Sequence, residues 1–192
     1  MSKHKLNQDN KKCKRVLTSN NILGKGAQGK VVSLGGNRVV YKIINKNSFI
    51  KSEYYLGKLA GDNNIGPKVY DFFSCDNKVV IVMERITETL EDWLKKPRTH
   101  NKLVSVYKTI MKLIGKMHKL GMIHGDLKID NIGRIGNRWV IIDYGWAFNH
   151  SYKDRRTMYY KITRGLMKYI LGKPSLFNER INIYLKKQLS IM

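Results

Sequence analysis

Short apolar runs separated by turn-forming residues dominate the first half of the chain. The runs are rich in Val, Ile, Leu and Phe and are bounded by Gly, Asn or Asp, as strands are. They lie at residues 22–24, 30–34, 39–44, 69–73 and 79–83. A helix is predicted among them over Ser48–Leu59, because Phe49, Leu56 and Leu59 fall on or near one face and Gly61 follows its end.

After Arg85 the apolar residues recur at helical spacing instead. A short helical segment begins with Leu90–Leu94 and ends at Pro97. A long helix is predicted over Leu103–Leu120 and is capped by Gly121. Its apolar stripe consists of Val106, Ile110, Leu113, Ile114 and Met117.

The remainder of the chain combines a hairpin with further helix. The hairpin turns at Gly136-Asn137 and leads into the apolar strand Trp139–Ile142. From about Asp154 onward, one stripe of a helical region is formed by Met158, Ile162, Leu166, Tyr169 and Ile170. The pattern as a whole predicts an α+β fold, with a small β-rich lobe followed by a mostly helical one.

The limits of these segments follow from composition. Residues 1–15 are polar and basic and are predicted to form a flexible tail, followed by a first lobe over 16–86 and a second over 87–192. The start lacks the apolar core of a secretory signal, and no apolar run is long enough to cross a bilayer. Cys13 and Cys75 stand apart and match no zinc pattern. These features favour an intracellular, cytoplasmic protein in a reducing compartment.

The charge balance changes the range of expected partners. The chain has 37 Lys and Arg against 14 Asp and Glu, a formal net charge of +23. Such a surface attracts polyanions, which include nucleic acid, anionic lipid and acidic proteins. The alternative is compositional drift, because Lys, Asn and Ile are abundant together, as in proteins encoded by AT-rich genomes. The charge alone does not define a nucleic-acid-binding function.

A glycine-rich stretch, Gly24-Lys25-Gly26-Ala27-Gln28-Gly29-Lys30-Val31, fits three patterns. A Rossmann fingerprint or a Walker A loop requires a helix after the loop, and here a turn and another strand follow. Val31 also stands where a Walker A loop has its metal-binding hydroxyl. The third pattern is a β-hairpin lid over nucleotide phosphates, with Val31 against the base. An ordinary glycine turn remains the alternative.

Lys42 lies in the apolar run that follows this hairpin. A lysine inside a buried strand requires a partner, and a phosphate together with a helix carboxylate would provide one. Glu53, in the predicted helix Ser48–Leu59, is the best candidate. The alternative is a lysine that faces solvent.

The most specific motif is His124-Gly125-Asp126-Leu127-Lys128-Ile129-Asp130-Asn131. Asp126 can accept the proton of an attacking hydroxyl, Lys128 can neutralise a moving phosphoryl group, and Asn131 can hold a metal ion. Asp143-Tyr144-Gly145 follows the strand Trp139–Ile142, where a carboxylate can bind magnesium.

In this order, the motifs resemble the protein-kinase superfamily from Leu23 to about Phe148. The resemblance implies a two-lobed fold with a hinge at Glu84–Ile86 whose backbone bonds the adenine of ATP. Lys42 would bind the α- and β-phosphates and pair with Glu53. The remaining nucleotide-binding residues would be Leu23, Gly24, Gly26, Gly29, Val31, Val40, Met83, Glu84 and Ile86.

The resemblance also implies the reacting centre. Asp126 would be the catalytic aspartate, assisted by Lys128 and Lys42, and Asn131 and Asp143 would bind Mg²⁺. H-G-D with D-Y-G resembles the vaccinia-related kinases. H-G-D with a short second lobe resembles the small atypical kinase associated with tRNA-threonylcarbamoyl modification and kinases of large DNA viruses. H-G-D also occurs in aminoglycoside-type phosphotransferases.

Departures from the kinase pattern limit what the resemblance implies. Val40 replaces a small alanine over the adenine, and Gly125 replaces the arginine that reads a phosphorylated activation loop. The prolines are Pro67, Pro97 and Pro174, so the peptide-positioning A-P-E motif is missing. The stretch after D-Y-G is short for a helical lobe, and a protein partner could complete it.

The expected function is Mg-ATP-dependent phosphoryl transfer to Ser or Thr of a protein substrate. The alternatives are a small-molecule phosphotransferase and a kinase-like scaffold that binds nucleotide or nucleic acid. A viral origin would place the protein in the host cytoplasm or the virion.

Overall fold

The computed structural model describes residues 11–26, 29–36, 38–46, 50 and 52–149. These residues form two compact units. The first ends at Ile86 and also includes Asp143–Gly145, and the second comprises Thr87–Ile142 and resumes at Trp146. The predicted stripe from Met158 to Ile170 lies outside the described residues, as do Phe49 and the first ten residues of the predicted tail.

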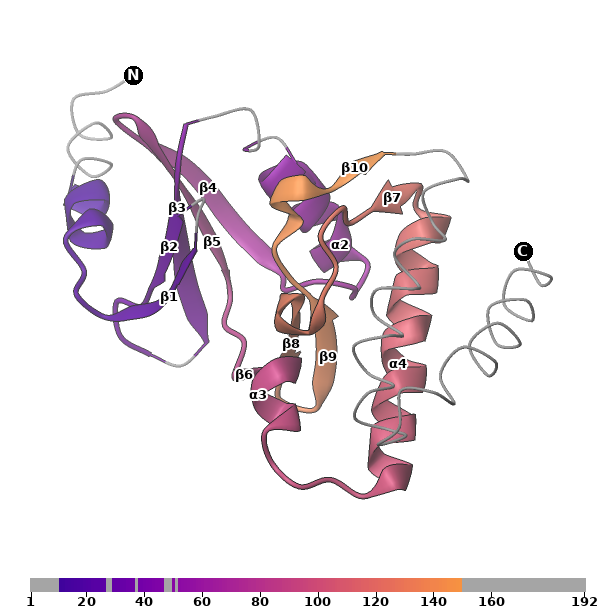
Figure 1. The fold of residues 1–192 in the computed structure, drawn as a ribbon. Coiled ribbons are helices and arrows are strands. Elements are labelled where there is room, and N and C mark those ends of the chain that lie inside the picture. Colours follow the sequence, from indigo (N-terminus) through magenta and orange to yellow (C-terminus); the bar gives the residue numbers. More distant parts are fainter. Residues whose placement is uncertain (1–10, 27–28, 37, 47–49, 51, 150–192) are drawn as a thin grey trace. The chain divides into compact units, whose positions relative to one another are not determined.

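A five-stranded sheet in the order β1-β2-β3-β5-β4 forms the body of the first unit (Figure 1). All neighbouring strands are antiparallel. The strands are β1 (Ile22–Gly26), β2 (Gly29–Val32), β3 (Val39–Asn45), β4 (Val69–Cys75) and β5 (Lys78–Glu84). All five coincide with runs predicted from the sequence, because each run carries β-branched residues between residues that turn the chain.

Side chains from the two faces of this sheet form two separate apolar clusters. Alternation along β3 directs Ile43 to one face and Ile44 to the other. The face of Ile44 also carries Val79 and Ile81 and is packed by Tyr54 and Phe72. The opposite face is covered by a helix over residues 11–17, whose Val16 is fully buried (Figure 1).

Two predictions about the start of the chain were wrong. Residues 11–15, expected in the flexible tail, belong to this helix, because Val16 and Leu17 supply an apolar anchor just beyond the basic residues. Cys13 and Cys75 are not isolated but form a disulfide, with their Cα atoms 5.6 Å apart. The cysteines therefore give no support for a reducing compartment.

The helical segment of the first unit differs in detail from the prediction. It consists of a π-helical turn, η1 (Ser52–Leu56), and of α2 (Gly57–Asp62). Gly61, expected past the helix end, lies inside α2, where a Cβ would collide with the carbonyl oxygen of Pro67. Leu59 is 38% exposed rather than buried. Close approach of the following loop, and not a cap, explains the glycine.

The described part of the second unit contains one long helix and two small sheets. Its described α-helices are α3 (Leu90–Leu94) and α4 (His100–Lys119). One sheet has the order β6 (Glu88–Thr89), β8 (Ile132–Ile135) and β9 (Arg138–Ile141), and the other pairs β7 (Met122–Ile123) with β10 (Phe148–Asn149). Every residue of the predicted stripe on α4 is buried. Among the residues described, no helix is long and apolar enough to span a membrane.

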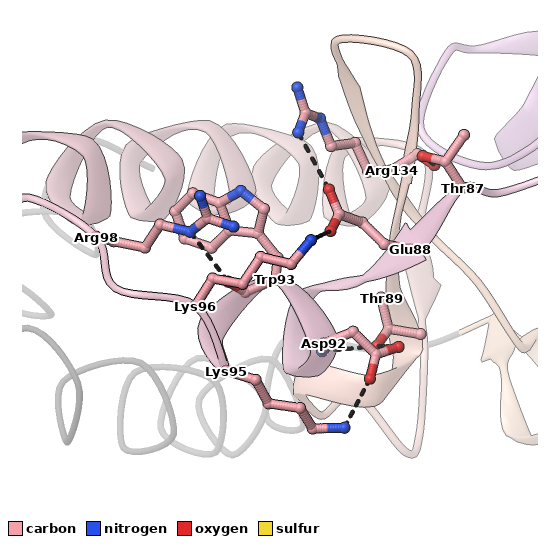
Figure 2. Close-up of polar contacts among 9 residues, drawn as sticks. All are labelled: Thr87, Glu88, Thr89, Asp92, Trp93, Lys95, Lys96, Arg98 and Arg134. Atoms are coloured by element: carbon pink, nitrogen blue, oxygen red, sulfur yellow. Dashed lines mark hydrogen bonds and ion pairs between the residues drawn. The ribbon is translucent and has the colours of Figure 1, made fainter.

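Polar contacts fix α3 against the sheet that contains β8 (Figure 2). Thr89 caps α3, accepting a hydrogen bond from the Asp92 amide at 3.1 Å. Arg134 on β8 pairs with Glu88 on β6 at 3.1 Å. The guanidinium of Arg98 lies 4.3 Å from the ring centre of Trp93, which is itself buried. The Arg134–Glu88 pair therefore links β6 to β8, the strand that directly follows the His124–Asn131 motif.

Candidate functional site

The glycine-rich stretch forms the predicted hairpin. β1 and β2 pair from Gly24 opposite Val31 to Gly26 opposite Gly29, and residues 27–28 at the tip lie outside the described part. A Cβ at Gly29 would collide with the carbonyl oxygen of Ile43 on β3, so this glycine is required by strand packing. At Gly24 and Gly26 a Cβ would meet no atom of the described residues within 4 Å. Packing inside the unit therefore does not explain these two glycines.

Several predicted nucleotide-binding residues share one face of the sheet. Val31 lies opposite Lys42, and Val40 lies opposite Met83, so strand alternation directs all four side chains to the same side. This is the face that carries Ile44 and Ile81. Val40 is buried, whereas Leu23 on β1 is 41% exposed.

The segment predicted as a hinge is anchored by its backbone. The amide of Glu84 donates to the Lys68 carbonyl at 2.9 Å, and the amide of Arg85 donates to the Arg38 carbonyl at 2.8 Å. Ile86 is the last residue of the first unit before the chain enters the second. These bonds hold the end of β5 between both of its neighbouring strands.

Lys42 joins two carboxylates within the first unit. Its Nζ lies 2.8 Å from Glu53 Oε1 and 2.8 Å from Asp143 Oδ1. The side chains of Lys42 and Glu53 are 12% and 6% exposed, while that of Asp143 is 46% exposed. The predicted pairing of Lys42 with Glu53 is therefore present in the structure, with Asp143 as an additional partner from a distant part of the chain.

Charge and burial act against each other at this cluster. Burial lowers the pKa of Lys42, but the charges of Glu53 and Asp143 outweigh it, so that the pKa is raised above its ordinary value. Burial raises the pKa of Glu53, and the charge of Lys42 opposes that rise. The Lys42 ammonium is thus held between one buried and one accessible carboxylate.

Asp143 has a left-handed backbone conformation, and the side chain of the next residue, Tyr144, is buried. Asp143 has φ +66°, a left-handed conformation that costs energy for any residue with a Cβ. Tyr144 is 2% exposed and packs near Gly57 at the start of α2, and burial raises its pKa well above the ordinary value. The buried Tyr144 ring therefore fixes the backbone beside Asp143, whose carboxylate is accessible.

The His124–Asn131 motif is an ordered loop of the second unit. His124 is fully buried, and its Nε2 lies 2.8 Å from the Ile142 carbonyl oxygen. Asn131 Nδ2 donates to the Asp126 carbonyl oxygen at 2.8 Å. The amide of Ile142 donates to the Asn131 carbonyl at 3.0 Å. The loop is therefore tied at both ends to the strand end that precedes Asp143.

The charged side chains of this loop point to solvent. Asp126 is 44% exposed, and the Lys128 ammonium lies 3.6 Å from its Oδ2. Lys128 is closer to Asp130, at 3.2 Å, and hydrogen bonding to Asp130 raises the pKa of Lys128. Sequence reasoning assigned no role to Asp130, although its position two residues from Lys128 could have indicated the contact.

Gly125 is required by the backbone of this loop. It has φ +78°, and a Cβ would collide with the carbonyl oxygen of Trp146. The arginine that Gly125 replaces in the pattern could not adopt this conformation without strain.

The predicted residues thus fall into two sets. Lys42, Glu53 and Asp143 meet in the first unit, and Asp126, Lys128 and Asn131 meet in the second. Asn131 and Asp143, predicted to bind metal, belong to different units. No group of three or more His, Cys, Asp or Glu side chains able to hold a metal occurs among the described residues.

Comparison with known families identifies the chain. Residues 17–169 match the model of the protein kinase domain, and this range includes both sets. The chain belongs to the protein kinase family. ATP use is typical of this family, and the α+β kinase fold predicted from the sequence is confirmed.

Relatives of this kinase are longer proteins. The chain is 29% identical over 143 residues to the probable serine/threonine-protein kinase fnkB of Dictyostelium discoideum. This match covers 71% of the chain and 26% of the relative. It is 28% identical over 184 residues to homeodomain-interacting protein kinase 1 of Caenorhabditis elegans, covering 85% and 22%. It is 24% identical over 140 residues to the dual specificity protein kinase TTK of Mus musculus, a match that covers 62% of this chain and 16% of the relative. The chain spans about a quarter or less of each relative.

Proposed function

We propose that this kinase transfers the γ-phosphoryl group of Mg-ATP to serine or threonine hydroxyls of proteins. The observation that carries the proposal is the buried Lys42–Glu53 pair at 2.8 Å with Asp143 on the same ammonium. A buried lysine held between two carboxylates is a pre-positioned cation that suits a phosphate ligand. Two of the relatives carry serine/threonine or dual specificity kinase names, which supports a protein acceptor.

The nucleotide would bind along the first unit. Gly24 and Gly26, whose Cα positions are unobstructed, would let the backbone of the hairpin approach the phosphates. Val31, Val40 and Met83 would contact the adenine together with Leu23, and the backbone of Glu84–Ile86 would bond its edge. Lys42 would hold the α- and β-phosphates, and Glu53 would keep the lysine aimed at them.

The proposed magnesium ligands offer suitable oxygen atoms. The Asp143 side chain is partly exposed, and its carboxylate contacts Lys42 through Oδ1. Asn131 uses its Nδ2 toward Asp126, which leaves its Oδ1 as a neutral oxygen ligand. Hard oxygen donors of this kind fit Mg²⁺. When bound, the metal would neutralise charge on the phosphates.

Asp126 would act on the acceptor. Its exposed carboxylate can orient the substrate hydroxyl and receive its proton as the oxygen attacks the γ-phosphorus and the bond to the β-phosphate oxygen breaks. Lys128, already beside Asp126, would balance charge on the transferred group. Asn131 would fix the Asp126 backbone through its 2.8 Å hydrogen bond.

The test compares wild-type protein with Asp126→Asn in transfer of radiolabelled γ-phosphate from Mg-ATP. Acidic and basic protein substrates, the kinase itself, aminoglycosides and sugars serve as acceptors. We expect wild type to label protein serine or threonine, and Asp126→Asn to be slower by about 10²–10⁴-fold with nearly unchanged ATP affinity. Undiminished turnover by Asp126→Asn would overturn the role of Asp126, and labelling of tyrosine or of small molecules alone would overturn the proposed acceptor.

A further inference from the structure

The outward face of α4 carries a line of lysines. Lys108, Lys112, Lys116 and Lys119, here called the lysine stripe, are all exposed. They follow one another at intervals of three or four residues, so they are neighbours on the helix surface. The opposite face is the apolar one, which includes Ile110, Ile114 and Met117. Orientation of α4 by its buried face therefore fixes the stripe toward solvent.

No acid among the described residues forms an ion pair with the stripe. The α4 sequence contains no Asp or Glu, and none of the four lysines joins an ion pair among the described residues. Like charges at this spacing oppose helix formation. Elsewhere in the described part, Lys58 pairs with Asp62 inside α2, and Lys95 pairs with Asp92 at the end of α3. An external polyanion would relieve the repulsion that α4 retains.

The surroundings of the stripe discriminate among polyanions. Helices that bind membranes place large apolar side chains beside their basic ones, but the exposed large hydrophobic residues of the described part all lie outside α4. Protein interfaces favour aromatic residues and arginine at their centre and are poor in lysine. Here the neighbouring exposed side chains are Asn101, Ser105 and Thr109. Lysine acting as a point charge suits a phosphate backbone.

We propose that the lysine stripe binds the sugar–phosphate backbone of a nucleic acid duplex, without reading its sequence. From Lys108 to Lys119 the helix rises about 16 Å. A duplex presents one negative charge per about 1.7 Å of its length, so each lysine of a straight helix finds a phosphate within reach. This proposal is independent of the phosphoryl-transfer reaction, because no lysine of the stripe belongs to the proposed catalytic or nucleotide-binding residues.

The experiment measures binding of a fluorescent mixed-sequence duplex to the full chain over a range of salt concentrations. The test variant is Lys108→Gln/Lys112→Gln/Lys116→Gln/Lys119→Gln. The matched control is Lys11→Gln/Lys14→Gln/Lys46→Gln/Lys68→Gln, which removes the same charge from exposed positions elsewhere. Glutamine keeps a high helix propensity, so α4 should fold, and thermal unfolding checks this.

We expect the stripe variant to bind the duplex more than tenfold more weakly at low salt. The slope of log affinity against log salt concentration should become less negative by about 3–4. This corresponds to roughly 0.9 for each phosphate that the variant no longer neutralises. The control should change much less, and phosphoryl transfer should be unaffected in both. Equal decreases in both variants would overturn the proposal in favour of diffuse net charge. Stripe-dependent binding that is stronger to anionic vesicles or to polyglutamate than to the duplex would overturn it in favour of lipid or acidic protein.

Discussion

At the residue scale, Lys42 is the partner of a buried carboxylate and also the proposed phosphate ligand. Its partner Glu53 is 6% exposed, so removal of the ammonium leaves a buried carboxylate without a counter-charge. The cost of such a change exceeds what the intact pair contributes, because an ion pair must first offset its own desolvation.

The first prediction separates these two roles. Lys42→Met should lower the free energy of unfolding by about 3–5 kcal/mol, whereas Lys42→Met/Glu53→Gln should recover much of that loss, and neither variant should transfer phosphate. Urea unfolding and phosphoryl transfer measure the two effects. Equal stability of the single and double variants would contradict an uncompensated charge on Glu53.

The pH dependence of the single variant provides a control. Burial raises the pKa of Glu53, so the folded state binds a proton more readily than the unfolded state does. Stability of Lys42→Met should therefore increase as the pH is lowered from neutrality toward the ordinary pKa of Glu. The double variant lacks this carboxylate and should not show the increase.

Gly29 and Gly26 belong to one motif, but the space around their Cα atoms differs. Only at Gly29 would a Cβ strike the backbone of β3. Gly29→Ala should therefore lower stability by about 1–3 kcal/mol through overpacking. Gly26→Ala should leave the unfolding midpoint nearly unchanged and raise the KM for ATP, measured by initial rates. A destabilised Gly26→Ala would show that its role is structural.

At the scale of elements, the helix over residues 11–17 is fixed to the sheet by several kinds of contact. Val16 is buried against Val32 and Val80, and Lys12 pairs with Asp71 at 2.6 Å. Cys13 adds a covalent link to Cys75 at the end of β4. Closure of this long loop restricts the unfolded chain and so favours the folded one.

The disulfide yields a prediction for this element. Cys13→Ser should lower the free energy of unfolding by about 2–4 kcal/mol under oxidising conditions. A reductant should lower wild type to the level of the variant and leave the variant unchanged, as followed by thermal unfolding. Two free thiols in oxidised wild type, detected by thiol titration, would contradict the link.

At the scale of the whole molecule, charge and function are distributed differently. The residues proposed for phosphoryl transfer come from both units, whereas the lysine stripe belongs to α4 alone. The net charge of +23 does not locate a binding site for a polyanion, whereas four lysines on one exposed face of α4 join no ion pair with any other described residue.

The sequence by itself determined the local elements and the chemical groups. Alternation placed β1 to β5, and helical spacing gave the buried face of α4, since local periodicity reflects which side of an element is covered. The pairing of Lys42 with Glu53 was also predicted, because a strand lysine after the glycine hairpin requires a partner. The specific roles of Asp126, Asn131 and Asp143 stay predictions.

Only the tertiary structure decided what depends on distant contacts. Cys13 and Cys75 are 62 residues apart, and nothing in their local sequence indicates that a helix lays one beside the other. Gly61 was expected past a helix end and Gly29 over the nucleotide phosphates, yet Pro67 leaves no room for a larger side chain at Gly61, and Ile43 leaves none at Gly29. Such constraints arise where segments that are distant in the sequence pack closely together. Local propensity does not encode these contacts, because they depend on packing in three dimensions.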